Sequence, residues 1–327
     1  MNVLISSAGR RGKLVQLIQT DLAEVYPSGK VIAIDRSRLS AAAHLAYTYE
    51  LVPSCSDPEF IGAVLDVCQR NNVGLIVPTI DTELPVYAQH RDVFGDKGIV
   101  VSVPTSAVVT IGADKMATSK WLVEQGFPTV KTALLNEVVQ SAEVWNFPLI
   151  VKPRSGSSSI GVSVAHSIDD LHRQASEDNF IIQEMAEGSE YTADAWANKS
   201  GQCRCVVLRR RLEVRAGEVS KGVTVKWPEM QLLVTQLINA LQGSYGAITV
   251  QFFAEGDDAE SAKFIEINPR YGGGYPLSWQ AGARFPLWTI QELADIPSSS
   301  RASEWLDNLV MLRYDESVYT TVSEVGL

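Results

Sequence analysis

The chain has 327 residues and a formal net charge of −10; hydrophobic residues make up 46% of it and charged residues 20%. This length allows two or three lobes with a sizeable core. The acidic balance argues against a broad nucleic-acid-binding surface, which requires clustered lysine and arginine, although a local basic pocket for a small anion stays compatible with it.

The N-terminus and the cysteines bear on location. The segment MNVLISSAGRRG has only three consecutive apolar residues before Ser6, and no long apolar run occurs, so neither a signal peptide nor a membrane span is expected. No CxxC pair is formed by the cysteines Cys55, Cys68, Cys203 and Cys205, and no histidine lies near the last two. We therefore expect reduced thiols rather than a zinc site, and a cytoplasmic location.

Short apolar strands alternate with amphipathic helices over the N-terminal third of the chain. Buried strands separated by helices form a parallel, doubly wound sheet that is covered on both faces, so this part is predicted to be a Rossmann-like lobe. The expected strands are residues 2–7, 30–36, 73–79 and 99–104, and the expected helices are residues 13–26, 58–72 and 84–98.

The turn after the first strand contains Gly9 and Gly12, and the second strand ends in Asp35, which raises the alternative of dinucleotide binding. The spacing is G-x-x-G, however, and the full G-x-G-x-x-G is absent, so a structural lobe is favoured. Doubly wound sheets bind ligands at the carboxyl ends of their strands, and turn or capping roles are the alternative for polar residues there. The candidates for a cleft at this edge are Arg10, Arg11, Asp81 and Glu83.

In the next part, Asp114 is expected to cap a helix that carries Lys115 and Lys120. A strand that ends in Lys152 then leads into the loop RSGSSSIG, residues 154–161. Backbone N–H and hydroxyl groups of such a loop can donate to phosphate oxygens, while a lysine adds a point charge. The loop is not a Walker A motif, because Val-Ser follows the second glycine in place of Lys-Ser/Thr. A flexible hairpin is the alternative.

From about residue 180 onward, the strands alternate more regularly and short Gly/Asn/Ser turns join them, which predicts an antiparallel sheet. The segment QEMAEGSE, residues 183–190, crosses between two strands. Strand-end backbone groups there can meet an adenine edge, and Glu190 can bind ribose hydroxyls. A solvated hairpin is the alternative.

Polar residues also interrupt the apolar strand FIEINPR. Glu266 and Asn268 should share one face because the strand period is two. The same period predicts Phe264 on that face, and Ile265 and Ile267 on the opposite, apolar face.

Gln251 of the preceding strand is expected beside Glu266. Together with Asn268 these side chains offer hard oxygen donors, which suit Mg²⁺ bound jointly by protein and phosphates. An ion pair between Glu266 and Arg270 is the alternative.

These motifs occur together in the order and spacing of one family. Through VKPRSGSSSIGV, QEMAEGSEYTADA and VQFF…FIEINPR, the chain resembles the ATP-grasp superfamily, particularly single-module proteins similar to the ATP-grasp part of the carbamoyl-phosphate synthetase large subunit. The resemblance extends over essentially the whole chain and implies an ATP-grasp fold of the α/β and α+β classes. The implied domains are a Rossmann-like pre-ATP-grasp lobe (1–108), a central lid subdomain (109–180) and a C-terminal subdomain with the metal site and a helical tail (181–327).

The resemblance also implies ATP and Mg²⁺ (or Mn²⁺) as cofactors. Lys115 and Lys152 match lysines that contact ATP phosphates, and Arg270 matches a catalytic arginine near the transferred phosphate. The lid loop is matched by Arg154, Ser155, Gly156, Ser157, Ser158 and Gly161, the adenine-contacting hinge by Gln183, Glu184, Met185 and Ala186, the ribose site by Glu190, and the metal site by Gln251, Glu266 and Asn268.

The implied activity is that of a ligase which joins a small carboxylic acid to an amine, less readily to a thiol, through an acylphosphate and with release of ADP and phosphate. The alternatives are an enzyme that stops at an acyl phosphate and a non-catalytic ATP-binding module. Only one module and no glutaminase region is found, so complete carbamoyl-phosphate synthesis is not expected. A homodimer is expected.

A cation-rich segment, residues 209–226, is the candidate for substrate recognition. Strand alternation predicts that Arg209, Arg211 and Arg215 point to one side, and a bidentate arginine suits a carboxylate. We expect Arg215 or Lys221 to anchor the acid, and we expect Arg215 to be one of the catalytic residues. An exposed basic hairpin is the alternative.

Overall fold

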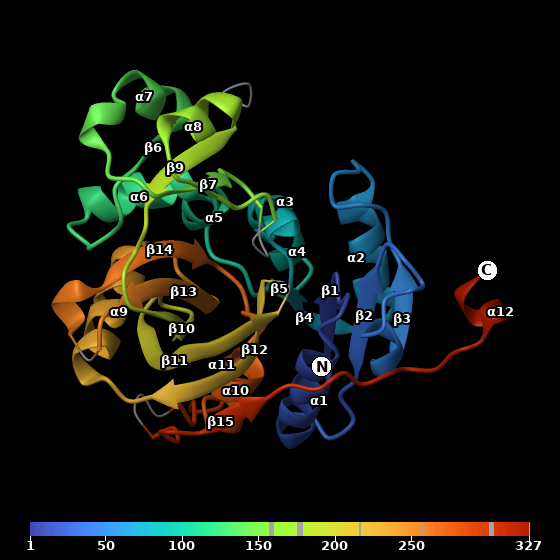
Figure 1. The fold of residues 1–327 in the computed structure, drawn as a ribbon. Coiled ribbons are helices and arrows are strands. Elements are labelled where there is room, and N and C mark those ends of the chain that lie inside the picture. Colours follow the sequence, from blue (N-terminus) through green and yellow to red (C-terminus); the bar gives the residue numbers. More distant parts are fainter. Residues whose placement is uncertain (157–159, 175–178, 216, 257, 301–303, 327) are drawn as a thin grey trace.

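The computed structural model describes residues 1–156, 160–174, 179–215, 217–256, 258–300 and 304–326. Three β-sheets organise these residues. Figure 1 shows the blue N-terminal lobe beside a body in which a green sheet lies above a larger sheet coloured from yellow to red. We call them sheet A (N-terminal), sheet C (green) and sheet B (the larger one).

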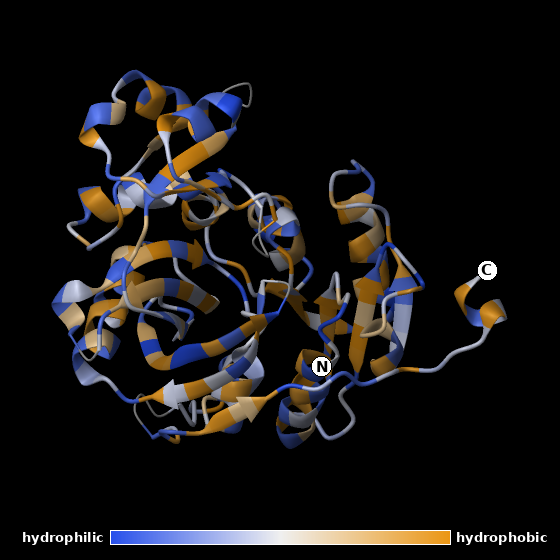
Figure 2. Cartoon of the chain, viewed as in Figure 1, coloured by the Kyte–Doolittle hydropathy of each residue, from blue (hydrophilic) through white to orange (hydrophobic). Residues whose placement is uncertain are grey.

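Sheet A is the predicted parallel sheet. Its strand order is β3-β2-β1-β4-β5, and every pair is parallel. Figure 2 shows hydrophobic residues concentrated on these strands, as expected for a sheet covered by helices. The strands are β1 (Asn2–Ser6), β2 (Val31–Asp35), β3 (Thr48–Leu51), β4 (Val73–Pro78) and β5 (Val100–Val101), and the helices are α1 (Gly12–Val25), α2 (Phe60–Arg70), α3 (Leu84–Gln89) and α4 (Arg91–Gly95), with 3₁₀ turns at Ala43–Leu45 and Asp81–Glu83.

Two boundaries differ from prediction. The helix expected over residues 84–98 is broken at His90, whose φ of −110° and ψ of 17° are not helical. The last strand covers two residues rather than residues 99–104, because Ser102 makes the final bond to Ile76 and the chain then enters the helix α5 (Ser106–Ala113).

Sheet C is a small antiparallel sheet with the order β6-β9-β7-β8. Its apolar side chains form a cluster of their own with Leu135, Val138 and Leu171 of the adjoining helices. This cluster is separate from the other hydrophobic clusters of the described residues, so sheet C is packed around a core of its own. Its elements are β6 (Thr132–Leu134), β7 (Leu149–Pro153), β8 (Ser163–Ala165), β9 (Phe180–Glu184), α7 (Leu135–Gln140), α8 (Ile168–Gln174) and the 3₁₀ turn Ala142–Val144; α6 (Lys115–Glu124) precedes it.

Sheet B is antiparallel, with the order β14-β13-β10-β11-β12-β15. The helix α9 covers one face, where Met230, Val234 and Leu237 pack on Ala195 and Ile248. Its elements are β10 (Ser189–Ala197), β11 (Cys203–Arg215), β12 (Glu218–Val225), α9 (Pro228–Ala240), β13 (Gly246–Ala254), the 3₁₀ turn Ala259–Ser261, β14 (Lys263–Asn268), α10 (Tyr275–Gln280), α11 (Phe285–Leu293), β15 (Val310–Leu312) and α12 (Val322–Val325).

A shared core joins the N-terminal lobe to sheet B. Ile5 and Leu14 of the lobe belong to the same buried cluster as Trp196, Phe285 and Trp288. The lobe is therefore packed firmly against the C-terminal part of the chain, in contrast to sheet C.

A buried carboxylate reinforces this junction. Asp21 of α1 is fully buried and accepts hydrogen bonds from Arg284 Nε (2.8 Å), Trp279 Nε1 (3.0 Å) and the Leu287 amide (3.0 Å). Burial raises the pKa of Asp21, and these donors oppose the shift.

The C-terminal segment crosses between the two halves. β15 pairs with the edge of β12, and the chain then runs under the N-terminal lobe to α12, where Glu324 accepts a hydrogen bond from Arg38 (Figure 1). Across the described ranges, no helix has the length and apolar character needed to cross a membrane.

Candidate active site

The polar face predicted on β13 and β14 is present. Gln251 lies directly opposite Glu266, and Asn268 lies opposite Thr249. The prediction for Phe264 is wrong: the register shifts between Gln251 and the next residue, and this irregularity turns Phe264 into the core.

These oxygen donors fit a metal ion that arrives with phosphates. Within the described ranges, no three His, Cys, Asp or Glu side chains are grouped to hold a metal alone. One carboxylate (Glu266) with two amide side chains (Gln251 and Asn268) matches Mg²⁺, which commonly takes one or two protein carboxylates and completes its shell with phosphate and water.

Lys152 brings sheet C to this face. Its side chain lies on β7 and is only 7% exposed. Burial, and secondarily the charge of Lys115, lower the pKa of Lys152 to about 8, while Glu266 and Glu190 oppose that shift. The charges of Glu190 and Glu266, both on sheet B, thus act on a lysine of sheet C.

The start of the lid loop is held on the first turn of α6. Lys115 Nζ donates to the Gly156 carbonyl (2.7 Å), and Asp114 caps α6 through the Met116 amide. Arg154 pairs with Asp114, and the bonds to this carboxylate raise the pKa of Arg154.

The other residues predicted to form the lid loop are partly described. Ser155, Gly156 and Gly161 are exposed, as a covering loop requires. Ser157 and Ser158, also predicted for this loop, lie outside the described residues.

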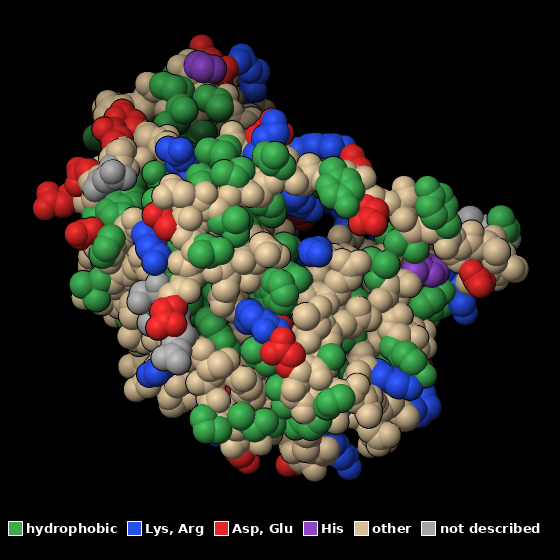
Figure 3. Space-filling model, turned by 90° about the horizontal axis from the view of Figure 1, so that it is seen from below, with side chains coloured by type: hydrophobic (Ala, Val, Ile, Leu, Met, Phe, Trp, Pro, Cys, Tyr) green, Lys and Arg blue, Asp and Glu red, His purple; other side chains and the backbone are tan. Residues whose placement is uncertain are grey.

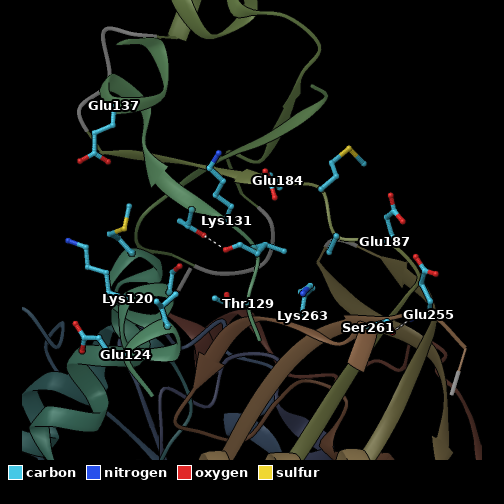
Figure 4. A pocket seen from close by; sticks show the side chains of 17 residues that line it. Lys120, Glu124, Thr129, Lys131, Glu137, Glu184, Glu187, Glu255, Ser261 and Lys263 are labelled. Carbon is cyan, nitrogen blue, oxygen red and sulfur yellow. Dashed lines mark hydrogen bonds between the residues drawn. The ribbon is translucent and has the colours of Figure 1, made fainter. Parts of the chain in front are cut away.

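The hinge lies at the end of β9. Gln183 is buried, but its side chain donates to Thr132 Oγ1 (2.9 Å), so this amide is used within sheet C. A cavity of about 880 Å³ is lined by Glu184, Met185, Ala186 and Glu187, together with residues of α6 and Lys263. Figure 4 shows Glu184 and Glu187 from close by, with Lys120 and Lys263 also around this cavity. Lys152, Glu190 and the oxygen donors Gln251, Glu266 and Asn268 are not part of that lining.

Glu190 is next to Arg211 at the start of β10. Arg211 Nη1 donates to the Glu190 carboxylate (2.5 Å) and Nη2 to the Gly217 carbonyl (3.2 Å). Burial raises the pKa of Glu190, and Arg211 counteracts this effect.

A second cavity, of about 780 Å³, lies between the N-terminal lobe and sheet B. We call it the interlobe cavity. It is lined by the predicted residues Arg10, Arg11, Asp81, Gln251, Glu266, Asn268 and Arg270, together with residues 309–314 and 316–318 of the C-terminal segment. On the face seen in Figure 3, Lys and Arg side chains lie beside a hollow in the surface.

Arg270 crosses this cavity. Its Nε and Nη2 each donate to one oxygen of Asp81 at 2.7 Å, and Nη2 also reaches Asn268 Oδ1 (3.3 Å). The expected alternative, an ion pair with Glu266, is therefore wrong. Burial by itself would lower the pKa of Arg270, but Asp81 and then Glu266 raise it above its ordinary value.

The expectation for Glu83 is also wrong. Glu83 is fully buried and accepts hydrogen bonds from the Ser6 and Ser7 hydroxyls and from the Thr79 and Ile80 amides. It fixes the ends of β1 and β4 and does not face the cavity.

The arginines of strand β11 do not all point to one side, contrary to the prediction from the strand period. Arg209 is buried, whereas Arg215 is 73% exposed, pairs with Asp315 and is not part of the cavity lining. Lys221 is half exposed and pairs with Glu213. Register shifts after Arg211 break the alternation, so the structure does not bring Arg215 or Lys221 to the site.

Sequence reasoning missed the buried network around Asp194. Arg209 donates to both oxygens of Asp194 (2.7 and 3.0 Å), and Ser278 Oγ donates to the same carboxylate (2.5 Å). A Cβ on Gly274 would lie 2.2 Å from Arg209 Nη1. The available signal was an Asp in the apolar strand TADAW, which needs a buried partner.

Comparisons with known proteins agree with this arrangement. Residues 3–102 match the PylC-like N-terminal domain, and residues 112–274 match the ATP-grasp domain. The chain is 25% identical over 223 residues to the carbamoyl phosphate synthase large chain of Bifidobacterium adolescentis (59% of this chain, 20% of that one). It is 23% identical over 274 residues to the formate-dependent phosphoribosylglycinamide formyltransferase of Corynebacterium glutamicum (74% of this chain, 65% of that one). It thus spans less than two thirds of both relatives.

The fold is shared with a solved structure. The biotin carboxylase domain dimer of Hydrogenobacter thermophilus 2-oxoglutarate carboxylase, in complex with MgADP, ADP and bicarbonate, superposes with a TM-score of 0.73 at 17% identity, covering 94% of this chain and 73% of that one. The predicted ATP-grasp fold with a parallel-sheet N-terminal lobe is therefore confirmed.

Proposed function

Because this chain is a single-module ATP-grasp protein with a PylC-like N-terminal domain, we propose that it is an ATP- and Mg²⁺-dependent ligase that joins a small carboxylic acid to an amine through an acylphosphate. The buried Lys152 of sheet C, on which the charges of Glu190 and Glu266 act, supports the proposal. The observation that carries it is the oxygen-donor face of Gln251, Glu266 and Asn268 in the interlobe cavity, beside Arg270, which is bound to Asp81. A site that only held a nucleotide would not require that arginine.

In this proposal, the nucleotide site lies between sheets C and B. Lys115 and Lys152 bind the phosphates, the described lid residues Arg154, Ser155, Gly156 and Gly161 cover them, residues 183–186 meet the adenine, and Glu190 meets the ribose. The domain boundaries 1–108, 109–180 and 181–327 are part of the same proposal. The separate core of sheet C supports a lid that moves relative to the rest.

Gln251, Glu266 and Asn268 would hold Mg²⁺. When bound there, the ion would neutralise phosphate charge and orient the phosphoryl group for transfer. The matching donors are the oxygen atoms that these three side chains offer on one sheet face.

The chain's own cations address the main physical obstacle, which is that a carboxylate and a triphosphate repel each other. With a pKa of about 8, Lys152 is mostly protonated at neutral pH, and its charge is poorly solvated, so it acts strongly on a nearby anion. The Asp81 pair fixes the direction of Arg270, which can stabilise charge without rearranging during the reaction. A closed lid would keep water from the acylphosphate.

A turnover assay tests the proposal. Mg-ATP is incubated with a panel of amino acids and small carboxylates, and ADP release is measured with and without amine acceptors. Amine-dependent ADP release supports the ligase; release with the acid alone supports an acyl-phosphate-forming enzyme instead, and nucleotide binding without any turnover supports a binding module.

The variant Glu266→Gln tests the metal site directly. Loss of the carboxylate should lower ADP release at least about a hundredfold, since it weakens the neutralisation of the phosphate charge. Glu229→Gln, at an exposed position in the first turn of α9, is the matched control. Wild-type turnover in Glu266→Gln would refute the assignment.

We also propose a homodimer, which the dimeric biotin carboxylase domain supports by analogy of fold alone. Light scattering of the purified chain would decide between monomer and dimer. The cytoplasmic location stays a prediction.

A further inference from the structure

Two arginines from opposite sides of the interlobe cavity meet at one carbonyl group. Arg11, from the turn before α1, donates through Nη1 to the Tyr271 carbonyl (3.3 Å). Arg270, from the end of β14, donates through its own Nη1 to the same oxygen (3.2 Å). Two like charges are thus neighbours in a partly dehydrated space, where their repulsion is stronger than in water.

The two arginines are unequally compensated. Arg270 has the bidentate pair with Asp81. Arg11 makes only two long bonds, to the carbonyls of Tyr271 and Thr79 (3.3 and 3.4 Å), and in the described part of the chain no carboxylate bonds to it. Burial, and then Arg270, lower the pKa of Arg11 to about 10, although Glu218 opposes the shift. A desolvated cation of this kind is stabilised by an anion.

Other donors face the same cavity. Arg11 is the N-cap residue of α1, a helix of 14 residues whose first turn has no side-chain cap, and residues 9–14 line the cavity. Helix N-termini favour negative charge. Independently, Arg209 lines the cavity with a side chain that is 1% exposed, and among the residues that the structure describes its Nη1 has no hydrogen-bond partner.

The nearby carboxylates act on Arg11 only through space. Asp81 uses both oxygens on Arg270, and Glu218 accepts from Arg313 Nη1 at 3.0 Å. Both carboxylates favour the charged form of Arg11, but burial and Arg270 outweigh them, so the guanidinium has no acidic hydrogen-bond partner in the described part of the chain.

We propose that Arg11 is a specificity-determining residue that binds an anionic group, a carboxylate or a phosphate, of the substrate at the end of the interlobe cavity bounded by Arg270 and the first turn of α1. This inference rests on the proposed function, because it takes the bound anion to be part of the substrate. The substrate class is a small anion that enters from the side of the N-terminal lobe and reaches Asn268 on the far side of Arg270. The anion relieves the repulsion between the two arginines, so it also completes the junction between the lobes.

Titration calorimetry on the full chain with two probes, succinate and inorganic phosphate, tests the site. Each probe is titrated at low ionic strength into protein saturated with Mg-ADP, so that phosphate cannot simply occupy an empty nucleotide site. Arg11→Gln removes the charge, and Lys97→Gln, at an exposed position of the N-terminal lobe outside the cavity lining, controls for the general electrostatic effect. Mg-ADP binding is measured separately in each protein, because it reports on the nucleotide site and not on Arg11.

At least one probe should bind the wild type saturably. Arg11→Gln should weaken binding of that probe about tenfold or more, as expected for loss of a charge-assisted hydrogen bond, while Lys97→Gln should change it less than about twofold. The probe that shows the dependence identifies carboxylate or phosphate as the recognised group. Absence of saturable binding of both probes to the wild type overturns the proposal, as does equal weakening by the two variants. If the wild type does not bind Mg-ADP, that result contradicts the proposed function instead.

Thermal unfolding without probes separates recognition from a structural role. Because Arg11→Gln removes a repelling, desolvated cation, its unfolding midpoint in anion-free buffer should equal or exceed that of the wild type. A midpoint clearly below the wild type, without a change in probe affinity, would show that Arg11 is a structural residue and would refute the inference.

Discussion

The ion pair between Asp81 and Arg270 connects the N-terminal lobe directly to a proposed catalytic side chain. Asp81→Asn removes the negative charge and keeps the size of the side chain. The variant leaves Arg270 with a neutral partner, next to the like charge of Arg11.

The cost follows from the burial of the pair. Removing one partner of a buried ion pair costs about 3–5 kcal/mol of unfolding free energy. Arg270 is 10% exposed, but Asp81 is 27% exposed, so water can solvate part of the site and we reduce this to about 2–3 kcal/mol. Asp315→Asn is a matched control, since its pair with Arg215 is 82% and 73% exposed and should contribute less than about 0.5 kcal/mol.

Urea unfolding of the two variants gives the comparison. Asp81→Asn should lower the midpoint with an unchanged denaturant slope, and Asp315→Asn should not. In turnover assays, Asp81→Asn should lower ADP release about tenfold or more at unchanged Mg-ADP affinity, because Arg270 is misdirected while the nucleotide site is intact. Equal stabilities of the two variants would refute the reasoning from burial, and unchanged turnover would refute the orienting role.

Two further predictions follow from the same geometry. Lys152 binds phosphate only when it is protonated, and its pKa is lowered to about 8. The Mg-ADP affinity should therefore be constant below that pH and fall by up to about tenfold per pH unit above it. Lys152→Arg, which stays charged, should show no such fall, and a pH-independent affinity in the wild type would contradict the assignment. Gly274→Ala should destabilise the chain by about 2–4 kcal/mol in urea unfolding, because the new Cβ meets Nη1 of the buried Arg209 at 2.2 Å and would displace the guanidinium that binds Asp194. Gly273→Ala, whose Cβ meets the Glu218 carboxylate at 3.1–3.3 Å, should cost less than about 1 kcal/mol; equal costs would show that close packing against Arg209 is not the reason for the glycine.

The sequence by itself was enough for the main elements and for part of the site. Apolar runs of strand length separated by amphipathic helices determine the parallel sheet A, because only burial on both faces accommodates them. Likewise Gln251 and Glu266 lie side by side as predicted, since adjacent antiparallel strands and a two-residue period leave little freedom.

Local irregularity limited that reasoning. A single register shift moved Phe264 from the polar face into the core, and shifts after Arg211 removed Arg215 from the row of Arg209. A strand period predicts faces only while the register is unbroken, and an extra residue in the ladder depends on the packing of neighbouring strands.

Only the tertiary structure decided which charges pair. Asp81 and Arg270 are 189 residues apart, and Arg11 and Tyr271 are 260 apart. Nothing local distinguishes Asp81 from Glu83, yet one carboxylate binds Arg270, the proposed catalytic arginine, and the other accepts hydrogen bonds at buried strand ends. The kinds of chemical groups available to the site are encoded in the residue types and their local spacing. The partner of each charged side chain is determined by the packing of the two lobes, because electrostatic and hydrogen-bond energies depend on distance and burial, which the linear order of residues does not contain.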